Sequence, residues 1–420
     1  MISLLLMTLP IPALFLTVIL VAFLLDSIAK EKIVVFSRWT DSASGRPVHI
    51  TFVGYSRGDS NCPAYRVLSG HHDTDLGVDQ STPLQVLNHL QAMLDFHGDR
   101  LHPQIRRWVI HQLSTIVSRD DILPTTLECR PLDRFGQFPA GGGGFSDVWR
   151  ALWNQKRVAV KVLRCFGTSA TERDRVWKSC KKEAIVWRQL HHDNILPLLG
   201  VNSTFSPGTF CLVSPWLGNG NIMRFIETYP AYPRINAIHD ILAGLKYLHG
   251  LVPAVVHADI RGSNILVKDN GHCCLSDFGL TILSETVATL HSTVRGSLRW
   301  LPPEAVLDTP GPQDSYRPPR DIYSFACTVV EIYSGKRPFD LKTDAQVVMA
   351  IHNDERPARP SVETGMSDAL WSLIDSCFDP DPSARPSASR LLEDCTAVCP
   401  PVVPRNPPVV PGNPRVHRRR

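Results

Sequence analysis

Polar side chains with catalytic potential gather in the segment HADIRGSN, residues 257–264, which lies between two short apolar runs. Asp259 could accept a proton, and Arg261 could neutralise a nearby anion. Asn264 offers the kind of hard oxygen that Mg²⁺ prefers. An ordinary polar turn is the alternative for this segment taken alone, so the neighbouring segments decide its interpretation.

A second carboxylate follows at the end of another apolar run, where Asp277 stands in SDFGL, residues 276–280. The sequence Asp269-Asn270-Gly271 between the two segments predicts a tight β-hairpin. That hairpin would bring Asp277 close to Asp259 and Asn264. Asn264 and Asp277 would then bind Mg²⁺ together with phosphates, which leaves Asp259 free to accept a hydroxyl proton.

A glycine-rich hairpin is predicted for residues 140–163, AGGGGFSDVWRALWNQKRVAVKVL. Glycines let backbone N–H groups lie close to phosphates because no Cβ intervenes. The alternating RVAVKVL predicts the second strand and places Lys161 where its ammonium can reach phosphate oxygens. No Gly-Lys-Ser/Thr follows the glycines, so this is not a Walker-type loop. A flexible linker is the alternative for a glycine run taken alone.

A buried Lys161 would need an anionic partner. The segment 171–190, TERDRVWKSCKKEAIVWRQL, reads as a helix with its apolar residues broadly on one side. Glu183 on this helix could pair with Lys161 and hold it in position. A surface carboxylate is the alternative for Glu183 taken alone.

Bulk composition sets limits on the class of protein. The chain has 420 residues, enough for two or three domains and a sizeable core. Hydrophobic residues make up 43%, which is typical of a globular protein. The net charge of +4 is too small to indicate a nucleic-acid partner. The 11 cysteines show no CxxC and no metal-type spacing, which indicates reduced thiols in a cytosolic setting.

The N-terminal segment, residues 1–25, carries no charged side chain and would span about 37 Å as one helix. That length can cross a bilayer, although Pro10 and Pro12 interrupt the pattern. Lys30 and Lys32 follow the segment, and basic residues favour the cytosolic side. We therefore expect a membrane anchor with the rest of the chain in the cytosol. A cleaved signal peptide and a soluble cytoplasmic chain are the alternatives.

The rest of the chain divides into four regions. Residues 33–83 are poorly patterned and read as a linker. Residues 84–130 predict a helical hairpin of unknown function, because leucine and isoleucine recur at helical spacing. A catalytic domain would span 133–396. The tail, 397–420, is rich in proline and ends in basic residues, so it should be disordered and could bind an SH3-type partner.

These segments resemble the protein kinase superfamily, whose motifs occur here in the same order. The family's fold is α+β and bilobal, with a small β-rich lobe and a larger helical lobe. Within the family, HHDNILPLLGV, LVSPWLGNGNI and GSLRWLPPE are similar to the tyrosine-kinase-like group of Ser/Thr kinases, as expanded in mushroom-forming fungi. The resemblance covers about 133–395 and rests on GGGGFSDV, VAVK, Glu183, HADIRGSN, DFG, LPPE (301–304), DIYSFACTVVEI (321–332) and ARP (384–386).

The resemblance implies an activity, the transfer of the γ-phosphoryl group of ATP to Ser/Thr hydroxyls of a protein substrate. Asp259 would be the catalytic base, and Arg261 would place a cation near the γ-phosphate. Asn264 and Asp277 would bind Mg²⁺. Because such a transfer needs little covalent work from the protein, catalysis would consist mostly of positioning and charge neutralisation.

The resemblance also implies an ATP site. Lys161 would contact the α- and β-phosphates and pair with Glu183, and Glu304 would form a structural ion pair with Arg385. Ser214 would stand at the inner limit of the adenine site. The predicted nucleotide-binding positions besides Lys161 are Gly141, Gly143, Phe145, Ser146, Val148, Ala159, Ser214, Pro215, Leu217 and Leu266.

Three positions depart from the family pattern. Ser146 replaces the third glycine of the loop. Arg261 replaces a lysine that is common in Ser/Thr kinases, which leaves a dual-specificity or tyrosine acceptor as an alternative. Ala258 replaces an arginine that pairs with a phosphorylated activation-loop residue in many relatives, so we expect no obligatory phosphate switch. A pseudokinase scaffold is the second hypothesis, but the catalytic lysine and both aspartates are present, which favours an enzyme.

Overall fold

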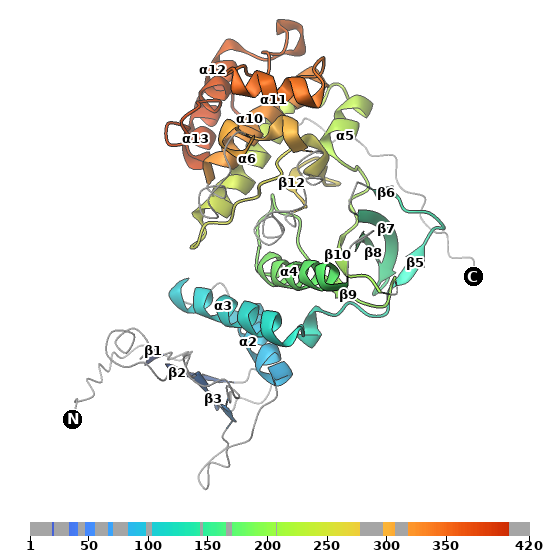
Figure 1. Cartoon of the computed structure of the whole chain (residues 1–420), viewed down its shortest axis with the longest axis vertical. Coiled ribbons are helices and arrows are strands. Elements are labelled where there is room, and N and C mark those ends of the chain that lie inside the picture. Colours follow the sequence, from blue (N-terminus) through green and yellow to red (C-terminus); the bar gives the residue numbers. More distant parts are fainter. Residues whose placement is uncertain are drawn as a thin grey trace, which may run out of the picture. The chain divides into compact units, whose positions relative to one another are not determined.

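The chain divides into two compact units, Met1–Met93 and Leu94–Arg420, and each is described by itself. Figure 1 shows the order of the elements along the chain. The computed structural model describes residues 19–20, 33–40, 47–54, 66–69, 83–97, 103–142, 146–164, 170–206, 208–277, 297–306 and 318–402.

The first unit contains a four-stranded antiparallel sheet with the strand order β1-β2-β3-β4. The region 33–83, which we expected to be a linker, therefore holds three strands. IVVFSRWT and PVHITFVG are rich in β-branched and aromatic residues, which favour strands, whereas the turn residues between them dominate the overall pattern. The bounds are β1 (Ile19–Leu20), β2 (Ile33–Thr40), β3 (Pro47–Gly54) and β4 (Arg66–Ser69).

The predicted membrane segment, residues 1–25, lies outside the described residues except for Ile19–Leu20 in strand β1. Among the helices that the structure describes, none is long and apolar enough to cross a membrane. Most of the predicted tail, residues 403–420, also lies outside the described part of the chain. An anchor and a tail ligand therefore stay predictions from the sequence.

Two helices lie in the region where a helical hairpin is predicted. Along α3, the residues Val109, Leu113, Ile116 and Val117 recur at helical spacing and are fully buried. Each such aliphatic side chain stabilises the fold by roughly 1.5–3 kcal/mol when it leaves water. The bounds are α2 (Pro83–His97), α3 (Pro103–Asp120) and a 3₁₀ turn η2 (Thr125–Leu127).

An antiparallel sheet with the order β5-β7-β8-β10-β9 forms the smaller lobe of the second unit, and β6 pairs with β7. Asn154 and Gln155 form the β7–β8 turn with φ of 49° and 64°, as a tight hairpin requires. β8 places Lys161 opposite Val148 on β7 and Leu212 on β10, in the middle of the sheet. The bounds are β5 (Asp133–Phe135), β6 (Gly141–Gly142), β7 (Ser146–Trp153), β8 (Lys156–Leu163), α4 (Ala170–Arg188), β9 (Gly200–Asn202) and β10 (Cys211–Pro215).

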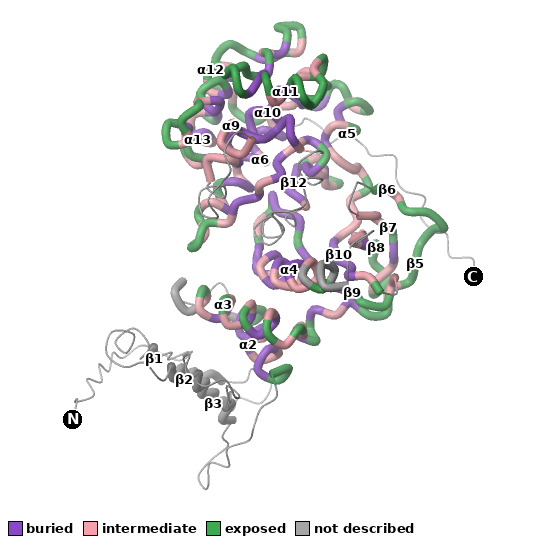
Figure 2. The backbone as a smooth tube through the Cα atoms, in the orientation of Figure 1, coloured by how far each residue is buried: buried purple, intermediate pink, exposed green. Residues whose placement is uncertain are grey.

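The larger lobe is helical. Helix α10 runs through its interior, and every residue from 321 to 333 is buried (Figure 2). Ser367 and Ser387 cap the first turns of α12 and α13 by accepting backbone N–H groups. The bounds are α5 (Ile222–Thr228), α6 (Arg234–Gly250), η5 (Leu298–Trp300), α9 (Pro303–Val306), α10 (Pro318–Ser334), α11 (Asp344–His352), η6 (Val362–Thr364), α12 (Asp368–Ser376) and α13 (Ala388–Val398).

A short hairpin follows the polar segment 257–264. Strands β11 (Ile265–Val267) and β12 (Cys273–Leu275) pair, with Leu266 opposite Cys274. The 3₁₀ turn η3 (Gly262–Asn264) precedes the hairpin, and Asp277 follows it. A small β-rich lobe and a larger helical lobe are thus both present, which confirms the expected bilobal α+β fold.

Candidate active site

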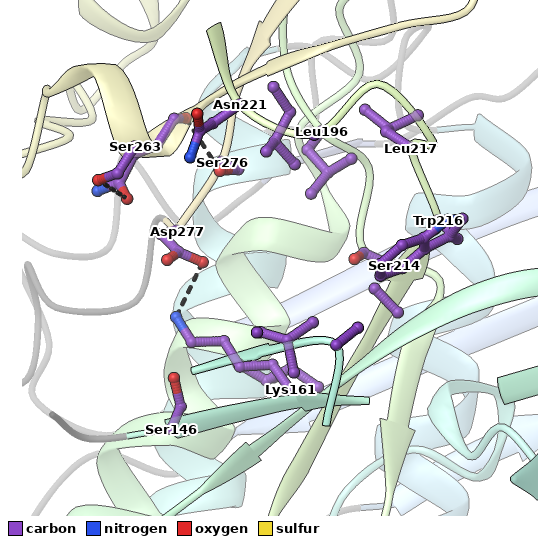
Figure 3. Close-up of a pocket in the computed structure, with 18 of the residues that line it drawn as sticks. Ser146, Lys161, Leu196, Ser214, Trp216, Leu217, Asn221, Ser263, Ser276 and Asp277 are labelled. Carbon is purple, nitrogen blue, oxygen red and sulfur yellow. Dashed lines mark hydrogen bonds and ion pairs between the residues drawn. The ribbon is translucent and has the colours of Figure 1, made fainter. Parts of the chain in front are cut away.

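A cavity of about 410 Å³ is lined by residues of both lobes (Figure 3). Two predicted site residues, Gly143 and Phe145, lie outside the described residues. All the others line the cavity: Gly141, Ser146, Val148, Ala159, Lys161, Glu183, Ser214, Pro215, Leu217, Asp259, Arg261, Asn264, Leu266 and Asp277.

Lys161 and Asp277 form an ion pair in this cavity, with 2.9 Å between Nζ and Oδ1 (Figure 3). Burial disfavours the Lys161 ammonium, but the charge and hydrogen bond of Asp277, together with the charges of Glu183 and Asp259, raise the pKa of Lys161. Burial of Asp277 is likewise outweighed by Lys161, which lowers the pKa of that carboxyl. Both groups are therefore charged at neutral pH. The Asp277 side chain is still 40% exposed, so it can meet a ligand in the cavity.

Glu183 does not form the predicted ion pair with Lys161. Its side chain is only 2% exposed, and its Oε1 has no hydrogen-bond partner. Burial raises the pKa of this carboxyl to about 8, although Lys161 partly opposes the rise. Helix α4 thus brings Glu183 to the cavity wall, but Lys161 has Asp277 as its partner instead.

Asp259 is held by hydrogen bonds to both of its carboxylate oxygens. Asn264 Nδ2 donates to Oδ2 at 2.7 Å and to the backbone oxygen of Asp259 at 2.8 Å. Ser297 Oγ donates to Oδ1 at 2.6 Å. Arg261 Nε lies 3.6 Å from Oδ2, close enough for an ion pair. Since the amide nitrogen of Asn264 is used in this way, its Oδ1 is the atom that could bind a cation.

The backbone before Asp259 is held by Asp321 of helix α10. The Asp321 carboxylate accepts the N–H of His257 at 2.8 Å and the N–H of Ala258 at 2.7 Å. It also contacts His249 Nε2 at 2.9 Å; burial opposes ionisation of Asp321, but the hydrogen bonds and charges of His249 and His257 together lower the pKa of this carboxyl. Ala258 has a φ of 62°, a left-handed conformation that costs a non-glycine residue about 1–3 kcal/mol. Asp321 therefore stabilises a strained turn that aims the next side chain, Asp259.

His257 has a structural role. Its side chain is fully buried, and its Nε2 lies 2.9 Å from the backbone oxygen of Ser276. Burial lowers the pKa of His257, so the imidazole is neutral at physiological pH. This hydrogen bond ties the Asp259 segment to the residue that precedes Asp277.

Glu331 of α10 supports the same segment from another side. Its Oε2 accepts the N–H of Gly262 at 2.8 Å and Nε1 of Trp300 at 3.1 Å. A Cβ at Gly262 would lie 2.6 Å from the Met223 side chain and 2.9 Å from Glu331 Oε2, so a larger residue there would force these side chains to shift. The Arg261 guanidinium lies 5.9 Å from the centre of the Trp300 ring.

The predicted structural ion pair between Glu304 and Arg385 is confirmed. Arg385 Nη1 and Nη2 each donate to one carboxylate oxygen of Glu304 at 2.7 Å. Its Nε donates to the backbone oxygen of Asp379 at 2.8 Å, and its side chain has no exposed surface. Such a fully bonded guanidinium fork joins α9 to the loop before α13.

The contacts of several lining and supporting residues were not predicted from the sequence. Ser297, Asp321, Glu331 and Trp300 stand in the quoted motifs GSLRWLPPE and DIYSFACTVVEI, but the motifs do not say which atoms they contact. The residues of the inner wall of the cavity show only an apolar pattern in the sequence. Such a pattern predicts burial and does not indicate a binding site. These residues are Cys180, Trp187, Leu196 and Leu212.

Asp277 and Asn264 could bind a cation only together with ligands from outside the protein. Asp277 and Asn264 offer hard oxygen ligands, which suit Mg²⁺. Among the described residues, no group of three or more His, Cys, Asp or Glu side chains could hold a metal ion. A cation at this site would therefore need further oxygen ligands, such as phosphates and water, as Mg²⁺ commonly takes.

A sequence model of the protein kinase domain matches residues 139–395. The chain therefore belongs to the protein kinase family. This match includes every predicted site residue and most of both lobes, from β6 to α13.

Among curated proteins, the chain is similar to the probable serine/threonine-protein kinase roco7 of Dictyostelium discoideum, with 31% identity over 60% of this chain and 10% of roco7. It is also similar to mitogen-activated protein kinase kinase kinase 3 of Arabidopsis thaliana, with 31% identity over 60% of this chain and 40% of that protein. The serine/threonine/tyrosine-protein kinase HT1 of Arabidopsis thaliana is 27% identical over 60% of this chain and 62% of HT1. The chain thus covers between 10% and 62% of these relatives' lengths.

Proposed function

We propose that this chain is an ATP-dependent protein kinase that transfers the γ-phosphoryl group to Ser/Thr hydroxyls of a protein. The observation that carries the proposal is that Lys161, Asp259, Asn264 and Asp277 all line one cavity of about 410 Å³. Several similar proteins are named serine/threonine-protein kinases, which supports the same activity.

The roles of the residues follow from their charges and contacts. Lys161, charged at neutral pH, binds phosphate oxygens. Asp259 orients the acceptor hydroxyl and accepts its proton, while Ser297 and Asn264 fix its carboxylate. Arg261 neutralises charge at the transferring group, with a planar fork where a lysine would offer a point charge.

Mg²⁺ and ATP are the cofactors of this proposal. Asp277 and Asn264 Oδ1 are the oxygen donors that would hold Mg²⁺, which neutralises phosphate charge when it is bound. Ala159, Val148 and Leu266 line the cavity with apolar surface that suits a nucleobase. ATP supplies the phosphate oxygens that complete the coordination of Mg²⁺.

The test uses the full chain, γ-labelled ATP and mixed Ser/Thr and Tyr peptides. The parent should transfer label to serine and threonine, while Asp259→Asn and Asp277→Ala should each be slower by about a hundredfold or more. Mg·ATP should raise the melting temperature of the parent but not of Asp277→Ala. Equal, negligible transfer by all three proteins, with no Mg·ATP shift, would instead indicate a scaffold.

The same experiment shows which amino acid, serine, threonine or tyrosine, accepts the phosphoryl group. HT1 is named a serine/threonine/tyrosine-protein kinase and shkC of Dictyostelium discoideum a dual specificity protein kinase, so label on tyrosine is the second outcome. Phosphoamino-acid analysis distinguishes the two. Comparing phosphoproteins from cells with the parent or Asp259→Asn would then identify the protein substrate.

Location and further partners are also proposed. The uncharged segment 1–25 and the lysines that follow it support an anchor with the kinase domain in the cytosol. Protease protection of a reporter fused at residue 40 tests this topology, and a soluble cytoplasmic chain would leave no membrane-bound fraction.

The proline-rich tail 397–420 supports an SH3-type partner, and binding of the tail to a panel of SH3 domains would test this proposal.

A further inference from the structure

Helix α3 lies outside the family-matched region 139–395, yet it packs against helix α4 of the small lobe. Four of its side chains are fully buried: Val109, Leu113, Ile116 and Val117. They recur at helical spacing, so they form one face of α3. The opposite face is exposed, as at Thr115 and Arg107.

Polar contacts tie both ends of α3 to α4. Near its start, Arg106 Nη2 donates to the backbone oxygen of Gln189 at 2.7 Å, directly after α4 ends. Just after its end, Asp121 forms an ion pair with Lys181 at 2.8 Å, and Lys181 also donates to the Asp121 backbone oxygen at 2.9 Å. The two helices therefore run antiparallel. The Lys181 side chain is only 16% exposed, whereas that of Asp121 is 50% exposed.

The attachment to α3 and the active-site cavity involve different sides of α4. Lys181 contacts the residue after α3, whereas Glu183, two positions further, lines the cavity. Residues two apart on a helix point in different directions. Helix α4 therefore connects the α3 surface to Glu183, and the position of α4 decides where the Glu183 carboxylate lies.

The docked arrangement leaves Glu183 without its expected partner. Lys161 is paired with Asp277, and the buried Oε1 of Glu183 has no hydrogen bond. A buried carboxyl group whose Oε1 lacks a hydrogen-bond partner is unfavourable, so other contacts must hold α4 in this position. The packing of α3 against α4 and the two polar contacts are such contacts. In protein kinases, phosphoryl transfer requires the pair between this lysine and this glutamate.

We propose that α3 is a built-in inhibitory clamp, which holds α4 where Glu183 cannot pair with Lys161. Release of α3 lets α4 move, so that Glu183 forms an ion pair with Lys161. Asp277 is then free to bind Mg²⁺. This inference rests on the proposed kinase activity. Kinase activity is then regulated by any event that detaches α3 from α4. Such an event acts on the region 84–130 of this chain.

The experiment compares two full-length variants that each place one carboxylate on α3. Leu113→Asp puts it on the buried face, and Thr115→Asp puts it on the exposed face as the matched control. We expect Leu113→Asp to raise the phosphotransfer rate roughly five- to hundredfold, and Thr115→Asp to match the parent. Equal or lower activity of Leu113→Asp, with Mg·ATP-dependent thermal stabilisation retained, overturns the clamp.

A charge swap decides the matter if Leu113→Asp does not fold. Asp121→Lys should raise activity severalfold because it places two cations together at the end of α3. Adding Lys181→Asp restores an ion pair of reversed polarity and should return activity towards that of the parent. No effect of Asp121→Lys, or no reversal in the double variant, contradicts the clamp.

Failure of the proposed activity has a separate signature. If no variant transfers phosphate, the proposed kinase activity is wrong. The affinity of the variants for Mg·ATP then tests the clamp by itself. Leu113→Asp, or Asp121→Lys if that variant does not fold, should then bind Mg·ATP more tightly than Thr115→Asp, because Lys161 and Asp277 are no longer restricted to each other. Equal affinities overturn the clamp.

Discussion

Ser297 and Asp259 are joined by a hydrogen bond of 2.6 Å although they stand 38 residues apart in the chain. The hydroxyl donates to Oδ1, and Asn264 occupies Oδ2. The carboxylate plane is therefore fixed from both sides before a substrate arrives. Such preorganisation favours a catalytic base, because no reorientation is then needed during the reaction.

The first prediction concerns this hydrogen bond. Ser297→Ala removes the donor to Asp259 and leaves Oδ1 without a protein partner. A hydrogen bond to a charged group contributes about 1.5–3 kcal/mol, so we expect kcat to fall roughly ten- to a hundredfold. Ser297→Thr keeps the hydroxyl and should retain most of the activity. Steady-state kinetics with a peptide substrate decide the matter, and an unchanged kcat in Ser297→Ala would contradict the assigned role.

The second prediction concerns the stability of the larger lobe. Arg385→Ala leaves the Glu304 carboxylate without its bidentate partner, and we expect the free energy of unfolding to fall by about 3–5 kcal/mol. Arg385→Lys should be intermediate, because an ammonium cannot reproduce the fork. Arg390→Ala, which removes an exposed ion pair with Asp394, is the control and should change little. Urea unfolding of all three variants measures these differences.

The sequence predicts the chemical groups of the site better than their support. Lys161, Asp259, Asn264 and Asp277 follow from motifs in which a few adjacent residues carry the signal. Asp321 and Glu331 do not, because they act across 64 and 69 residues of chain on backbone N–H groups of the catalytic segment. Because almost any residue type can donate its backbone N–H, such a hydrogen bond gives no signal in the sequence.

The sequence also cannot specify which of two arrangements a site adopts. The pattern around Glu183 predicts a partner for Lys161, and Glu183 does reach the cavity wall. Asp277 competes for the same ammonium, and the position of α4 decides between the two carboxylates. That position depends on α3, which is more than sixty residues from Glu183 in the chain. The bilobal fold is easier to predict, since hairpins and amphipathic helices have local patterns.

The third prediction uses the raised pKa of Glu183, about 8 in the folded chain against an ordinary value of 4.5. Below pH 4.5 the carboxyl is protonated in both states. Between these values the folded state keeps a proton that the unfolded state has lost, so stability falls as pH rises. We expect the unfolding free energy of the parent to fall by a few kcal/mol relative to Glu183→Gln between about pH 5 and 8.

Urea unfolding at several pH values measures this difference. Glu227→Gln, on the exposed side of α5, is the matched control and should follow the parent at every pH. Parallel curves for the parent and Glu183→Gln would show that Glu183 is paired with a cation in solution. The same result in Leu113→Asp, but not in the parent, is what release of α3 predicts.

The fourth prediction concerns control by phosphorylation. Ala258 has only a methyl side chain, which cannot bind a phosphate, and its N–H donates to Asp321 where its backbone is in the left-handed conformation. The catalytic segment is therefore fixed without an arginine–phosphate contact. Replacing Thr281, Ser284, Thr286, Thr289, Ser292 and Thr293 together by alanine should leave kcat/KM within a few fold of the parent. A loss of roughly a hundredfold, about 2.7 kcal/mol, would mean that a phosphate on these residues orders the site by a contact other than Ala258.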